Sequence, residues 1–100
     1  MTSEETLSGL GARRAAHELL AAVLRRHQSL DDALEQSAAM ASLAPRDRAL
    51  ARLIVATCLR RLGQIDRVLS QLLDHPLPAR ATLTQDALRI GAAQLLFLDT

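Results

Sequence analysis

The sequence contains almost no aromatic residues and no lysine. Its hundred residues include one Phe and no Trp or Tyr, although 49% of them are hydrophobic. A core can therefore form, but it has to be built from aliphatic side chains. All twelve basic residues are Arg. Arginine suits bidentate contacts with phosphate, and a GC-rich genome produces the same bias, so this composition alone identifies no ligand.

The single cysteine, Cys58, excludes a disulfide framework and a cysteine-rich metal centre. It lies in an apolar run, where cysteine behaves as a small hydrophobic residue, and nothing nearby predicts the lowered pKa of a nucleophile. The three histidines, His17, His27 and His75, have no metal-ligand spacing with one another or with Cys58. The four glycines form no phosphate-binding loop. We therefore expect no catalytic residue, no metal and no cofactor in this chain.

No segment of the sequence has the pattern of a targeting signal or a membrane span. The first ten residues lack a basic start followed by an apolar run, and no apolar run approaches membrane-spanning length. We expect one small cytoplasmic domain without a membrane partner.

The net charge is +1, but residues 11–61 carry nine Arg against five acidic residues, whereas residues 62–100 carry three Arg against four acidic residues. The excess of positive charge thus belongs to the first half of the domain.

The spacing of apolar residues predicts an all-α domain folded as an antiparallel helical bundle. Residues 1–10 have the composition of a flexible lead-in, and the helical domain is expected over residues 11–100. Two Ser or Thr residues, Ser29 and Thr82, are followed three positions later by Asp or Gln, as in capping boxes. The five expected helices cover approximately residues 12–27, 29–38, 45–62, 65–73 and 82–98.

The run LIVATCL, residues 53–59, is compatible by itself with a strand or a helix. It lies within residues 46–62, which contain no Gly or Pro and are too many for an ordinary strand. At helical spacing the apolar residues cover more than half of the circumference, which is typical of a buried helix. We therefore expect the central helix of a bundle. Its arginines Arg48, Arg52 and Arg60 are interpreted as structural.

Asp66 follows the predicted break at Gly63. It is expected either to serve as an acidic residue in the first turn of a helix or to pair with an arginine, with Arg60 as the candidate.

The last predicted helix, over residues 82–98, has apolar residues on two sides and no stop signal before its end. We therefore expect the domain to be incomplete at its C-terminus, with at least one more helix to follow.

Arginine pairs are the main candidates for ligand binding. Pairs at residues 25–26 and 60–61 end predicted helices, where positive charge is favourable. Arg13 and Arg14 instead lie near the predicted start of a helix, where cations are disfavoured, and with the backbone N–H groups there they would form a site for phosphate. Without a set of aromatic residues to stack bases, contact with RNA would be mainly electrostatic and salt-sensitive.

Several motifs follow one another over residues 12–99: Arg13-x-x-Ala16-x-x-x-Leu20, QSLDDAL, RDRALARLIVATCLRRLGQID, LLDHPLP and ALRIGAAQLLFLD. Their order resembles the NusB-like all-α domain, most closely the version at the N-terminus of bacterial rRNA 5-cytosine methyltransferases. Antitermination proteins of the NusB branch usually have an aromatic residue where this sequence has Ala21 and Ala22. Ala93 also stands at a commonly aromatic position, which is a small departure.

This resemblance implies an RNA-binding accessory domain that positions small-subunit rRNA for a C-terminal methyltransferase domain in the parent chain. The C-terminal domain would bind S-adenosylmethionine and supply the catalytic cysteines, so this chain alone would be inert and Cys58 would not be catalytic. In NusB the arginine-rich first helix contacts RNA, which points to Arg13, Arg14 and His17 as RNA-binding residues.

Two other functions remain open. A free-standing transcription antitermination factor would bind RNA and a small ribosomal protein. An interaction scaffold would have no affinity for RNA and would use the second apolar side of the last helix to dock a helical partner.

Overall fold

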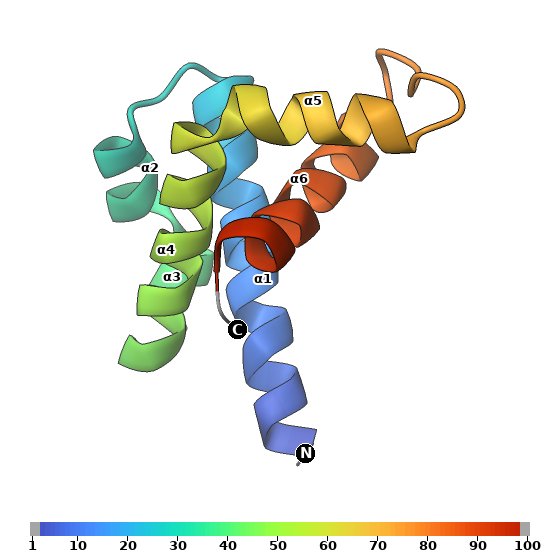
Figure 1. Cartoon of the computed structure of the whole chain (residues 1–100). Helices are drawn as coiled ribbons and strands as arrows, with labels where there is room; N and C mark the ends of the chain where they lie inside the picture. The colour runs from blue at the N-terminus through green and yellow to red at the C-terminus, as the bar shows by residue number, and fades with distance from the viewer. Residues whose placement is uncertain (1–2, 99–100) are drawn as a thin grey trace.

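The computed structural model describes residues 3–98, and within this range the chain forms six helices and no strand (Figure 1). The prediction of an all-α bundle is confirmed. None of the described helices combines the length and the apolar character needed to cross a membrane. The helices are α1 (Ser3–Leu24), α2 (Leu30–Gln36), α3 (Ala38–Ala41), α4 (Pro45–Arg60), α5 (Leu62–Leu72) and α6 (Thr82–Phe97).

The core lies where α1, α4 and α6 meet. Helix α4 packs chiefly against α1, α6 lies against both, and α5 crosses one end of the bundle (Figure 1). Truncating a buried leucine here to Ala would cost about 2–5 kcal/mol, because apolar contacts are lost and a cavity remains. The core is aliphatic, as the composition predicts. Its largest apolar side chains with almost no exposure are Leu19, Leu20, Ile54, Val55 and Ile65.

Alanines bring the two central helices close together. Ala12, Ala15 and Ala16 of α1 and Ala51 of α4 are all fully buried. Small side chains at a helix crossing allow a short distance between the helix axes. The alanine-rich composition of α1 therefore reflects its position between other helices.

Helix α1 begins at Ser3, well before the expected start near Ala12. Residues 3–10 thus belong to α1, residues 1 and 2 lie outside the described residues, and the flexibility of residues 1–10 stays a prediction. A glycine inside a helix costs only about 1 kcal/mol relative to Ala, so Gly9 and Gly11 do not end it. A Cβ atom at Gly11 would lie 3.2 Å from Leu43 Cδ2, so glycine lets the segment containing Leu43 approach α1.

Helix α1 ends at Leu24, close to the expected end near His27. His27 has a φ of 57°, the left-handed conformation that commonly follows helix C-termini. The backbone N–H of Gln28 donates to Ala22 O at 3.1 Å and satisfies one of the last carbonyls.

The expected helix over residues 29–38 is in fact two short helices, α2 and α3. Ser29 caps α2 as predicted, because its Oγ accepts a hydrogen bond from the Asp32 backbone N–H at 3.1 Å. Ser37 interrupts the helix with extended backbone angles and caps α3, its Oγ accepting from Met40 N–H at 3.1 Å. A second serine cap inside the predicted helix is the reason that the prediction missed the break.

Helix α4 is the central helix that the sequence predicts. Pro45 occupies its first turn after the N-cap residue Ala44. Ala51, Ile54 and Cys58 are fully buried, while Leu53 is 46% exposed, so one side of the apolar run reaches the surface. The chain bends at Arg61, and α5 begins at Leu62, just before the glycine to which the break was assigned.

Helix α6 begins at Thr82 with Ala81 as its N-cap residue, and no side chain caps it. The prediction of a capping box from Thr82 to Gln85 is therefore wrong, because Thr82 already belongs to the helix. The two predicted apolar sides are only partly covered: Ile90 is buried, whereas Leu83 is 71% and Leu95 is 88% exposed.

Candidate nucleic-acid interface

The predicted RNA-binding residues lie together on one side of the crossing between α1 and α6. Arg13, Arg14 and His17 of α1 line a shallow hollow of about 320 Å³ with residues of α6. Two arginines and a histidine thus face a small apolar floor, and none of the lining residues is acidic. The α6 residues are Ala87, Ile90, Gly91 and Gln94.

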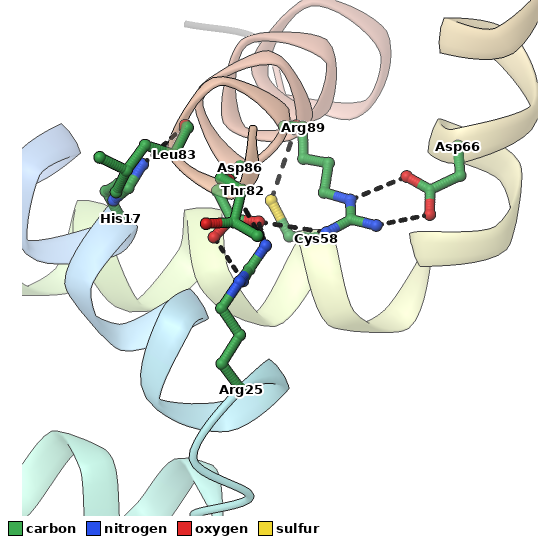
Figure 2. Close-up of polar contacts among 8 residues, drawn as sticks. All are labelled: His17, Arg25, Cys58, Asp66, Thr82, Leu83, Asp86 and Arg89. Carbon is green, nitrogen blue, oxygen red and sulfur yellow. Dashed lines mark hydrogen bonds and ion pairs between the residues drawn. The ribbon is translucent and has the colours of Figure 1, made fainter. Parts of the chain in front are cut away.

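Polar contacts hold two of these side chains against α6. The Arg13 Nε–H donates to Gln94 Oε1 at 3.1 Å. His17 Nε2 lies 3.0 Å from Leu83 O, and because a carbonyl only accepts, Nε2 carries the proton that it donates (Figure 2). Arg14 is exposed beside them. A neutral amide, unlike a carboxylate, leaves the positive charge of Arg13 uncompensated.

The prediction that backbone N–H groups at a helix start join Arg13 and Arg14 in an anion site is wrong. Because α1 begins at Ser3, both arginines lie in the middle of the helix, where the backbone N–H groups are already bonded within it. The helix dipole therefore contributes nothing to a site there. What distinguishes these residues is their convergence with His17 on a hollow that no acidic side chain lines.

A second group of arginines is neutralised by carboxylates on another side of α6 (Figure 2). The Arg25 guanidinium donates to both oxygens of Asp86, at 2.6 and 3.1 Å. Arg89 donates to Asp86 at 3.1 Å and to both oxygens of Asp66 at 2.8 Å. Side-chain exposure is 1% for Asp86 and 11% for Arg89. The four residues carry no net charge and join α1, α5 and α6.

This ion network corrects one expectation and confirms another. Asp66 pairs with an arginine, as one of two alternatives predicted, but the partner is Arg89 and not Arg60. For Arg25 the sequence predicted only a favourable interaction with the dipole at the end of the helix. In the structure the main partner of Arg25 is Asp86. The sequence signal for this network is the spacing of Asp86 and Arg89, which are oppositely charged, three residues apart and the only charged residues of α6.

Burial and hydrogen bonding shift the pKa values of Cys58 and Arg89, which lie in or beside the network. Burial raises the pKa of the Cys58 thiol from 9.0 to about 11, with Arg89 opposing the rise and Asp86 adding to it. The Cys58 Sγ lies 3.7 Å from Arg89 O in the core. The hydrogen bond to Asp66 is the main factor that raises the pKa of the Arg89 guanidinium, although desolvation opposes it. Cys58 is therefore a protonated core residue, as predicted, and not a nucleophile.

The arginines of α4 occupy a different environment. Arg48 donates to Leu43 O at 2.8 Å and so ties α4 to the loop before it. Arg48 and Arg52 line a larger hollow of about 810 Å³, but Asp31 and Glu35 line it as well. The balanced charge makes this hollow a poor site for an anion, although it is larger. A structural role for Arg48, as predicted, agrees with its contact.

No group of three or more His, Cys, Asp or Glu side chains in the described part of the chain is arranged to hold a metal ion. The described residues also lack the strand followed by a glycine-rich turn and a helix that binds S-adenosylmethionine-type cofactors in Rossmann-like domains.

The fold and the basic hollow together define an all-α domain with an uncompensated cationic surface. The model of the NusB family matches residues 10–100, and this chain belongs to that family. The chain is also 40% identical, over 96 residues, to ribosomal RNA small subunit methyltransferase B of Xanthomonas campestris. That match covers 95% of this chain and 22% of the relative, in its N-terminal region. No solved structure matches the chain.

Proposed function

We propose that this chain is an RNA-binding domain that helps to hold small-subunit ribosomal RNA for a cytosine-C5 methyltransferase. The observation that carries the proposal is the hollow between α1 and α6, which two arginines line without a carboxylate. Similarity to a small-subunit rRNA methyltransferase supplies the class of RNA. On this proposal the protein works in the cytoplasm, where ribosomal RNA is modified.

The hollow would bind the RNA backbone. Arg13 and Arg14 would contact phosphate, since guanidinium groups form charge-assisted and bidentate hydrogen bonds with phosphate oxygens. The Nε2–H of His17 is directed to Leu83 O, so in the neutral ring Nδ1 is an acceptor that suits a ribose 2′-OH. Affinity would fall with salt, because each neutralised phosphate releases counterions.

Catalysis and S-adenosylmethionine binding belong, on this proposal, to a domain outside these hundred residues. The chain spans about a fifth of the length of the curated relative that it matches, so the remaining part of such an enzyme would supply both. The similarity to a methyltransferase also favours this function over that of a free-standing antitermination factor, which would pair with a small ribosomal protein.

The proposal is tested by equilibrium binding of a small-subunit rRNA segment at several salt concentrations. The double variant Arg13→Gln/Arg14→Gln should weaken binding and lower the slope of log affinity against log salt by about 1–2, because two phosphate contacts are lost. The matched control, Arg67→Gln/Arg80→Gln, removes two exposed arginines outside the hollow and should change the affinity much less.

A third variant tests the hollow without changing charge. A Cβ atom added at Gly91 meets no other atom within 4 Å, so Gly91→Leu would place its side chain in open space on the lining of the hollow. We expect weaker RNA binding by Gly91→Leu at an unchanged salt slope. Wild-type affinity in both Gly91→Leu and the Arg13/Arg14 double variant would contradict the proposed site.

A further inference from the structure

The only aromatic residue of the chain is at the surface, beneath an arginine. Phe97 lies in the last turn of α6 and is 38% exposed. The Arg61 guanidinium carbon lies over its ring, 5.1 Å from the ring centroid. Arg61 is exposed, and its NH1 donates to Gln64 Oε1 at 3.3 Å. The cation–π contact and this hydrogen bond hold the guanidinium above the ring.

This cation–π pair lies next to the basic hollow along α6. Gln94, which accepts the hydrogen bond from Arg13, precedes Phe97 by three residues, and residues three apart are neighbours on one helix face. Arg13 approaches this face from α1, and Arg61 approaches it from the junction of α4 and α5. Two cationic side chains from different helices therefore flank the last turns of α6.

We propose that the Arg61–Phe97 pair is a stacking site for an unpaired base of single-stranded RNA whose backbone lies in the α1–α6 hollow. This inference rests on the proposed function and adds a base contact to the backbone contacts. Bases stack on guanidinium planes as well as on aromatic rings, and such stacking tolerates any base. A guanidinium that already lies on Phe97 is oriented before RNA arrives, so less side-chain entropy is lost on binding.

The contact also explains why an arginine suits residue 61. A lysine has the same charge but no plane on which a base can lie. Phe97 serves here as a support for the guanidinium and not as part of the core. On this proposal, base stacking would add to a contact with RNA that the sequence predicts to be mainly electrostatic.

The test uses a single-stranded rRNA segment and the variants Phe97→Leu and Arg61→Lys. Phe97→Leu removes the ring and Arg61→Lys removes the plane, while both keep every charge. Each should weaken binding about fivefold or more, with the salt slope unchanged because the phosphate contacts remain. The control Leu95→Ala truncates an apolar side chain of the same helix end, 88% exposed, and should leave the affinity unchanged.

A fluorescent adenine analogue in the RNA gives a second readout, since its emission falls when it stacks. We expect the emission to fall with the wild-type chain and to fall less with Arg61→Lys. Wild-type affinity and quenching in both variants would overturn the stacking site, while RNA binding that still depends on Arg13 and Arg14 would leave the proposed function standing. If the wild-type chain binds no RNA, the proposed function fails, and the stacking site fails with it.

Discussion

Two arginines, one within α1 and one directly after its last residue, contact α6 and find different partners there. Arg25 meets Asp86, a carboxylate with 1% exposure that also binds Arg89. Arg13, three turns earlier along α1, meets the neutral amide of Gln94 at the surface. The first contact belongs to a group of two arginines and two aspartates without net charge. The second borders a hollow whose lining is positive.

The two contacts are expected to serve different purposes: that of Arg25 stabilises the fold, and that of Arg13 leaves a positive charge available for binding. A buried carboxylate with several hydrogen bonds stabilises the fold only while its partners remain, because an unpaired buried charge is strongly unfavourable. An exposed arginine beside a neutral group contributes little to stability, and its charge stays available to a ligand. The ion network is therefore expected to hold α1, α5 and α6 together, and the hollow is expected to be dispensable for folding.

The largest predicted effect comes from breaking the network at its centre. Asp86→Ala leaves Arg25 without its main partner and removes one partner of Arg89, so the free energy of unfolding should fall by about 3–5 kcal/mol. Urea unfolding measures this change. The control is Asp74→Ala, an exposed aspartate in the loop before α6, which should change stability by less than about 0.5 kcal/mol. Equal effects of the two variants would contradict the assigned role of Asp86.

A smaller effect is expected at alkaline pH. In the folded chain the thiol of Cys58 keeps its proton until its pKa of about 11, whereas the unfolded thiol loses it above 9.0. The unfolded state then binds fewer protons, so stability should fall as the pH rises from 9 to 11, by on the order of 2 kcal/mol. The chain has no Lys or Tyr, so Cys58 is the side chain that titrates in this range. In Cys58→Ala the decline should disappear.

The same substitution at Arg14, within α1, and at Arg25, directly after α1, tests the comparison of the two contacts directly. Arg25→Gln removes two hydrogen bonds to a buried carboxylate and should cost about 1–2 kcal/mol. Arg14→Gln acts at an exposed position and should change stability by less than about 0.5 kcal/mol. Thermal unfolding of the two variants under identical conditions gives the comparison. A larger cost for Arg14→Gln would show that the hollow has a structural role.

Periodicity was sufficient to predict the helices that have a continuous apolar stripe. The central helix with Pro45 in its first turn, the cap at Ser29 and the buried Cys58 are each confirmed, because each depends on residues close in sequence. The start of α1 was missed because the lead-in was predicted from the composition of residues 1–10, and the apolar stripe begins only at Ala12.

The partners of the arginines could not be predicted in the same way. Arg25 and Asp86 are 61 residues apart, and only the packing of α1 on α6 brings them together. The same packing decides that Arg13 faces an amide and not a carboxylate. Arg13 and Arg14 were selected by the argument about the helix start, which proved wrong, and by the family resemblance, which also added His17. The role of all three in binding RNA stays a prediction. The Arg61–Phe97 contact was missed because it joins residues far apart in the sequence and depends on how the end of α6 lies against the junction of α4 and α5.

The central claim is that the arginines of the hollow, and not those of the network, meet RNA. Nitrogen-15 NMR of the arginine Nε–H groups tests it most directly, because all twelve basic side chains are arginines. On titration with a small-subunit rRNA segment, the signals of Arg13 and Arg14 should shift, while those of Arg25 and Arg89 stay in place. Shifts confined to Arg48 and Arg52, or shared equally by all twelve signals, would contradict the account.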